Sequence, residues 1–182
     1  MTLRMMRDDS DASKALMLDV LRSRSDREAL AASIGLAHAF GENTPGQAIA
    51  VLTRSLSAPR AQIEFQDELL YAEGGLQLVV RALERVGPAI DAYLSDVLVA
   101  LERAESGDAA DIATWLLEVV CRTSEPRPRS LLPLTHAQER VVLAIADAST
   151  LWESPNLFVS WLQNLGLGES REALRAVAGR RR

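Results

Sequence analysis

Helix-start signals recur along the whole chain, and no alternating apolar pattern typical of β-strands competes with them. Three segments place a hydroxyl three residues before Glu or Gln, the capping box that satisfies two backbone N–H groups: Ser25–Glu28, Thr44–Gln47 and Thr135–Gln138. Four prolines suit a first helical position, where the missing N–H costs nothing: Pro45, Pro59, Pro88 and Pro155. Leu and Ala, both strong helix formers, make up nearly a third of the 182 residues. The sequence therefore predicts an all-α fold of about ten short antiparallel helices.

The helix starts are expected near residues 11, 26, 45, 59, 76, 88, 108, 135, 155 and 169. Apolar residues recur at spacings of three and four after Pro88, with polar residues opposite them, so that helix is predicted to have one wet face. The apolar positions are Ile90, Leu94, Val97, Leu98 and Leu101, and the polar ones are Asp91, Ser95 and Glu102. Residues 112–120 are apolar on more than one side, which indicates an inner helix.

The expected helices also show a loose repeat. Starts near 11, 45, 76 and 108 are 34, 31 and 32 residues apart, and each interval holds two helices. In this spacing, over residues 11–122, the chain resembles the HEAT/armadillo class of α-solenoids, which implies helix pairs stacked side by side. An irregular helical bundle of the same length is the alternative.

A proline-rich segment divides the pattern. Residues 121–133 hold three prolines within eight positions, which forbid a continuing helix. They are predicted to form a linker between a helical-repeat-like domain at 1–120 and a three-helix C-terminal unit at 134–182. The alternative is an ordered loop within one domain.

Composition and motifs exclude several classes. One Cys excludes a disulfide framework, and neither a secretory signal nor a membrane-spanning apolar run is present, so a cytoplasmic protein without a membrane partner is expected. Phosphate-loop, dinucleotide-binding and metalloprotease motifs are absent, and Gly166 and Gly168 are interpreted as a helix cap and a turn. We therefore expect no enzyme, cofactor or metal site. The rival is an enzyme in which Cys121 is a nucleophile activated by His136, with His38 interpreted as a core or boundary histidine.

Charge is the most uneven property of the sequence. The net charge is −5, but residues 61–120 hold twelve Asp or Glu against three Arg, a net charge of −9. On the helix expected after Pro59, an acidic stripe lies at spacings of three, four and seven: Glu64, Asp67, Glu68 and Tyr71. Like charges at these spacings repel, so the stripe indicates either a basic partner or simply a solvated face.

The C-terminal residues permit a second interpretation. Trp161 and Phe158, three residues apart, are either core side chains or an interface anchor. Residues 165–175 resemble the turn and recognition helix of helix-turn-helix proteins, although Leu162 replaces the usual small residue and Glu169 and Glu172 would face phosphates. This resemblance implies a DNA-binding regulator.

Taken together, these features predict a protein-interaction module, either an adaptor or a binding inhibitor, that docks a basic protein on an acidic surface. Nucleic acid is not expected as a partner, and a homo-oligomer is possible in principle because a solenoid end can dimerise. The partner-binding residues are predicted to be the acidic and aromatic side chains Glu64, Asp67, Glu68, Tyr71, Asp91, Asp96, Glu102, Asp108, Asp111 and Trp161.

Overall fold

The computed structural model describes residues 10–22, 26–57, 75–121, 133–153 and 165–179, together with Val159, Leu162 and Gln163. These residues form eight α-helices and no strand, which confirms the all-α prediction. The helices are α2 (Asp11–Val20), α3 (Asp26–Phe40), α4 (Gly46–Ser55), α6 (Gly75–Val86), α7 (Leu94–Arg103), α8 (Ser106–Val119), α9 (His136–Asp147) and α11 (Arg171–Ala178). Three 3₁₀ segments join them: η1 (Gly41–Asn43), η2 (Gly87–Tyr93) and η3 (Ser149–Trp152).

The chain divides into two compact units, residues 1–97 and 98–182, and the division falls inside α7. The predicted linker lies almost wholly outside the described residues, as do the helices expected to start at Pro59 and Pro155. The full helix count, the HEAT-like stacking and the domain boundary therefore stay predictions. Among the described residues, no helix combines the length and the apolarity needed to cross a membrane.

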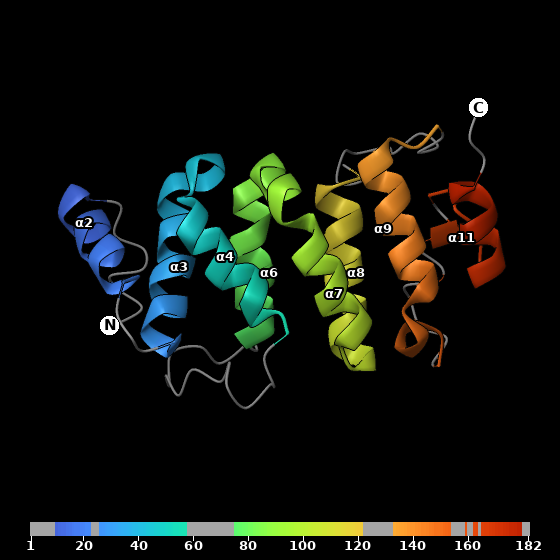
Figure 1. Ribbon diagram of the computed structural model, residues 1–182, viewed down its shortest axis with the longest axis horizontal. Helices are drawn as coiled ribbons and strands as arrows, with labels where there is room; N and C mark the ends of the chain where they lie inside the picture. The colour runs from blue at the N-terminus through green and yellow to red at the C-terminus, as the bar shows by residue number, and fades with distance from the viewer. Residues whose placement is uncertain are drawn as a thin grey trace. The chain divides into compact units, whose positions relative to one another are not determined.

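The first unit is built around α3. Nine consecutive residues of this helix, from Ala29 to Ala37, are buried, because α2, α4 and α6 all pack against it (Figure 1). Most of these nine residues are Ala, Ser or Gly, and their small side chains let the neighbouring helices approach closely. The Ser33 hydroxyl donates to the Ala29 carbonyl oxygen at 2.7 Å, so its burial leaves no unpaired hydroxyl.

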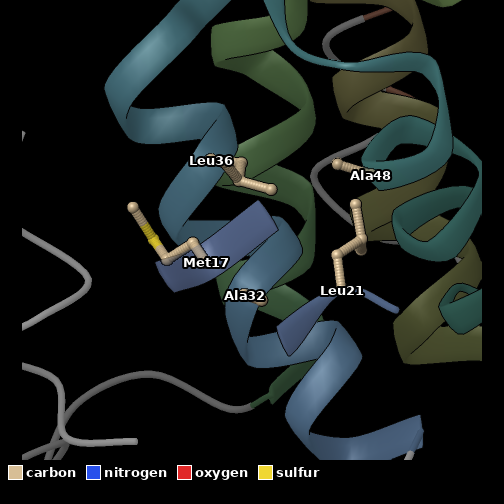
Figure 2. Close-up of a cluster of buried hydrophobic side chains, with 5 residues drawn as sticks. All are labelled: Met17, Leu21, Ala32, Leu36 and Ala48. Atoms are coloured by element: carbon tan, nitrogen blue, oxygen red, sulfur yellow. The ribbon is translucent and has the colours of Figure 1, made fainter. Parts of the chain in front are cut away.

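Larger side chains fill the space between α2, α3 and α4. Figure 2 shows Met17 and Leu21, from α2 and its C-terminal cap, beside Ala32 and Leu36 of α3 and Ala48 of α4. All five are buried. Fully burying one side chain the size of Leu36 contributes roughly 2 kcal/mol to folding, so this cluster fixes α2 on the unit.

Two left-handed glycines turn the chain in this unit. Gly41 follows α3 with φ of 55°, and Gly87 follows α6 with φ of 57°, a conformation that costs a residue with a Cβ atom more than it costs glycine. The Tyr93 hydroxyl then donates to the Gly46 carbonyl oxygen at 3.0 Å, and a Cβ atom at Gly46 would lie only 2.7 Å from that hydroxyl oxygen. Glycine at 46 therefore lets Tyr93 join the end of η2 to the start of α4.

Two expected helix starts differ from the structure. The predicted capping box at Thr44 is wrong, because the Thr44 hydroxyl donates to the Gly41 carbonyl oxygen and closes η1 instead. Pro45 is the N-cap of α4 and Gly46 its first residue. Pro88 lies in the first turn of η2, and the α-helical conformation begins only at Leu94. The segment after the left-handed Gly87 thus winds as a 3₁₀ helix first.

Among the described helices of the second unit, α8 is the most apolar. Ile112, Trp115, Leu116 and Leu117 are all buried, which confirms the prediction of an inner helix. The capping box predicted at Thr135 is also confirmed: Gln138 N–H donates to Thr135 Oγ1 at 3.3 Å, and Thr135 N–H donates to Gln138 Oε1 at 2.9 Å. The Thr150 hydroxyl donates to the Ala104 carbonyl oxygen at 3.1 Å and so ties η3 to the residue after α7.

The glycines of the second unit are a cap and a turn, as predicted. Gly166 has φ of 73°, its N–H donates to the Gln163 carbonyl oxygen, and Leu167 N–H donates to the Leu162 carbonyl oxygen. This is the Schellman pattern, and Leu162 and Leu167, the two positions whose side chains often pack together in it, are both buried. Gly168 has φ of 91°, and a Cβ atom there would lie 2.6 Å from that of Ala173, so the turn lies directly against α11.

Candidate protein-binding surface

Half of the predicted partner-binding residues lie outside the part of the chain that the structure describes. They are Glu64, Asp67, Glu68, Tyr71 and Trp161, and their role stays a prediction. The other five are described. Asp91 in η2, Asp96 and Glu102 on α7, and Asp111 on α8 are exposed, whereas Asp108 is half-buried in the first turn of α8.

Two of these carboxylates have a structural explanation. Asp96 lies in the first turn of α7 and Asp108 in the first turn of α8. A negative charge there interacts favourably with the unpaired N–H groups at the helix start, typically by 0.3–1 kcal/mol. Asp108 also has an interaction within the protein, as does Asp111. Glu102 lies near the C-terminal end of α7, so the favourable interaction at the helix start explains Asp96 but not Glu102.

The exposed face of α7 holds an apolar side chain between two acids. Val99 is 41% exposed, and Leu16 on α2 is the other large apolar side chain that the structure leaves exposed among the described residues. Asp96 precedes Val99 by three residues and Glu102 follows it by three, so both carboxylates neighbour Val99 on the helix surface. No described ion pair involves Asp96 or Glu102. This face, defined by Asp96, Val99 and Glu102, is called the α7 face below.

The sequence predicted one part of this face and missed the other. The expected polar positions Asp91, Ser95 and Glu102 are all exposed, and the expected apolar positions of the same segment are buried or half-buried. Val99 was missed, although it follows Ser95 by four residues and precedes Glu102 by three, which places it on the wet side of a helix. Helical spacing alone was therefore a sufficient signal for it.

Cys121 does not have the surroundings of a nucleophile. The side chain is 3% exposed, and burial raises the pKa of its thiol to about 12. A nucleophilic cysteine needs a lowered pKa, supplied by a neighbouring cation or base, so that the thiolate forms at neutral pH. The two histidines, His38 and His136, are both exposed. His38 is exposed in the last turn of α3, so the core alternative of its predicted core or boundary position is wrong.

In the DNA-binding interpretation α11 would be the recognition helix. Its two arginines form hydrogen bonds to other residues of the second unit. On α11, Arg171 Nε donates to the Ala146 carbonyl oxygen at 3.1 Å, and Arg175 Nη2 pairs with Asp147 Oδ1 at 2.6 Å. Trp152 Nε1 donates to the Ile145 carbonyl oxygen at 3.0 Å. Trp152 and Arg171 thus donate to two carbonyl oxygens at the C-terminus of α9, whereas Arg175 pairs with the exposed side chain of Asp147, the last residue of that helix.

The first turn of α11 also carries an acid, Glu172, whose pKa is lowered. Its own backbone N–H and the Ser170 hydroxyl donate to the Glu172 carboxylate and lower the pKa of that group. A negative charge at the start of a recognition helix repels phosphate. Arg171 and Arg175 each have a partner within the unit, and the Glu172 carboxylate is hydrogen-bonded at the start of α11.

No group of three or more metal-ligating side chains occurs within the described ranges. Comparison with known proteins identifies no relative: no family model, no curated protein and no solved structure matches the chain.

Proposed function

We propose that the protein is a protein-binding module whose α7 face docks a basic, amphipathic segment of another protein. One observation supports this most directly: Val99 is exposed in the middle of the face, with Asp96 and Glu102 on either side of it. An apolar side chain gains stability when a partner covers it, and the two carboxylates attract cationic side chains around that contact.

The charge distribution supports the same class of partner. The net charge of −9 over residues 61–120 attracts a basic protein over distances of about a Debye length, roughly 8 Å at physiological salt. Such attraction speeds encounter, while the apolar contact holds the complex afterwards. In this proposal Asp91, Asp108 and Asp111 contribute to steering, and Val99 is the anchor. Glu64, Asp67, Glu68, Tyr71 and Trp161 remain proposed contacts of the same kind.

Regulation of transcription is the less supported function. Arg171 and Arg175 already hydrogen-bond to the end of α9, which leaves α11 with less free positive charge for phosphates. An adaptor or a binding inhibitor fits the α7 face better, because both need a surface that binds another protein.

A pair of synthetic peptides tests the proposal. One is an amphipathic helix with Leu on one face and Lys on the other, and the second has Glu in place of each Lys. Fluorescence anisotropy of the labelled peptides at about 0.1 M salt should show at least tenfold tighter binding of the Lys peptide, weakening as salt rises.

Matched variants assign this binding to the α7 face. Val99→Ser should weaken binding of the Lys peptide about tenfold, and Asp96→Asn with Glu102→Gln should weaken it by a similar factor. Leu16→Ser removes the other exposed apolar side chain and should leave the affinity unchanged. Equal binding of both peptides, or equal losses in the Leu16 and Val99 variants, would contradict the proposal.

A further inference from the structure

The exposed side of α7 also carries a positive charge. Arg103, the last residue of the helix, is exposed, and no ion pair among the described residues involves it. A cation in the last turn interacts favourably with the helix C-terminus on any side of the helix, so this interaction explains the charge but not the side on which it lies. Arg103 follows Val99 by four residues and is therefore its neighbour on the helix surface. A segment that covers Val99 thus lies beside Arg103.

The five exposed residues of α7 are arranged evenly around Val99. The other four lie three and four positions before and after it: Ser95, Asp96, Glu102 and Arg103. At 100° per residue, all five fall within an arc of about 120°, and Val99 is at its middle. Asp96 and Arg103 lie on one side of Val99, and Ser95 and Glu102 lie on the other. Each side therefore holds one carboxylate.

The two carboxylates alone do not define a direction. A half-turn about the line through Val99, perpendicular to the helix axis, exchanges equal positions before and after Val99. It brings Asp96 onto Glu102, and both are acids. It also brings uncharged Ser95 onto positively charged Arg103. A basic amphipathic helix with matching cations on both sides of its apolar centre would therefore fit the carboxylates equally well in either direction. Among these five exposed residues, Arg103 is the charge that distinguishes the two directions.

We infer that Arg103 pairs with one acidic residue of a basic partner helix and thereby fixes the direction in which that helix lies on α7. This inference rests on the proposed function, because it concerns the segment that the α7 face binds. In either direction, partner residues four positions before and after the apolar centre face Asp96 and Glu102, so they are cationic. The residue that faces Arg103 lies three positions before the centre in an antiparallel helix and three positions after it in a parallel one. An acid at the unmatched position faces Ser95 and gains no charge pair.

Three peptides that differ at one place test the pairing. All have a central Leu on the apolar face and Lys four positions before and after it. One has Glu three positions before the centre, one has Glu three positions after it, and the third has Gln at both places. Fluorescence anisotropy with the full chain should show about threefold tighter binding of each Glu peptide than of the Gln peptide. Net charge alone predicts the opposite order, because the Gln peptide is the more positive.

Matched variants assign this preference to Arg103. Arg103→Glu should reverse it, so that the Gln peptide binds about threefold more tightly than either Glu peptide. Arg54→Glu changes an exposed arginine in the last turn of α4, a helix of the same length, and should leave the order of the peptides unchanged. A loss of stability in Arg103→Glu would weaken all three peptides alike and would not reverse their order.

Fluorescence quenching tests the direction. The single natural cysteine is buried, so a fluorophore can be attached to Glu105→Cys, an exposed position two residues after α7. A quencher on the peptide N-terminus should quench strongly when Glu precedes the centre and weakly when Glu follows it, and Arg103→Gln should remove this difference.

The outcomes separate this inference from the proposed function. Tighter binding of the Gln peptide to the wild type, or equal quenching by the two Glu peptides, would overturn the inference. If Val99→Ser still weakened the Gln peptide about tenfold, the proposed function would stand without it. No binding of any of the three peptides would overturn both.

Discussion

The helices α3 and α7 differ in how much of their surface the fold uses. α3 is buried over nine consecutive residues and packs against three other helices. Its residues must therefore fit the space between those helices. α7 alternates buried residues such as Val97 and Leu101 with an exposed side that carries Asp96, Val99 and Glu102. Substitutions on α3 should therefore change stability, whereas substitutions on the exposed side of α7 should change binding. Three predictions test this difference, and a fourth concerns the buried Cys121 that follows α8.

Leu36→Ala should produce the largest loss. Leu36 is fully buried on α3 and contributes to the core cluster, so its truncation leaves a cavity beside Met17 and Ala48. We expect a loss of about 3 kcal/mol in the free energy of unfolding, measured by urea denaturation followed by circular dichroism. Val99→Ala is the matched control on α7 and should cost less than about 0.5 kcal/mol. Similar losses in the two variants would remove the distinction between the helices.

Ala32→Leu tests the close approach of helices around α3. Ala32 is fully buried in the core cluster, so the larger side chain must displace its neighbours and should cost about 1–3 kcal/mol. The matched control is Ala50→Leu, which adds the same atoms at an exposed position of α4. It should change the free energy of unfolding by less than about 0.5 kcal/mol. If Ala32→Leu were as stable as the wild type, the packing around α3 would be looser than described.

Cys121 should make stability depend on pH in the alkaline range. Its pKa is about 12 in the folded protein and about 9 when exposed, so both states keep the proton below pH 9. Between pH 9 and 12 the unfolded state loses its proton first, and the free energy of unfolding should fall by up to about 1.4 kcal/mol per pH unit.

The matched variant for this prediction is Cys121→Ala. Its stability should fall less steeply between pH 9 and 10.5 than that of the wild type, because the titrating thiol is gone. At pH 8, a disulfide reagent should modify native Cys121 roughly a thousandfold more slowly than the unfolded chain. Rapid modification of the native thiol would show an accessible thiolate and would return support to a nucleophilic role.

The triple variant Asp96→Asn, Val99→Ser, Glu102→Gln should have the smallest effect on stability. Only Asp96 has a favourable position at a helix start, so the loss should stay within about 1 kcal/mol. The same variant should lose nearly all affinity for the Lys peptide. Leu36→Ala should behave in the opposite way: it loses stability, but the molecules that remain folded should bind the Lys peptide normally. A large drop in its thermal midpoint would show that these side chains serve the fold.

Local signals predicted much of the fold from the sequence. The capping box at Thr135 and the helix cap at Gly166 depend on residues no more than five positions apart, and both are confirmed. The Thr44 prediction failed because the hydroxyl had a competing acceptor in the preceding turn, the Gly41 carbonyl oxygen. The 3₁₀ winding of η2 was not predicted, since Pro88 is compatible with the start of either helix type.

The candidate site was predicted only in part, for a different reason. Charge is visible in the sequence, so exposed Asp91, Asp96, Glu102 and Asp111 were identified. An apolar residue such as Val99 has the same identity whether it is buried or exposed, and only its position relative to Ser95 and Glu102 distinguishes the two cases. The internal contacts of Arg171 and Arg175 connect residues 25 and 28 positions apart, which no local pattern shows.

Site-specific photo-cross-linking tests most directly whether the α7 face binds a basic protein. A photoreactive phenylalanine analogue replaces Val99 in one sample and the exposed Ala50 of α4 in another, in cells of the protein's own source. We expect a cross-link at position 99 to a basic protein, lost when Asp96→Asn and Glu102→Gln are added, and no such cross-link at position 50. The absence of a cross-link at position 99, or the same products at both positions, would contradict it.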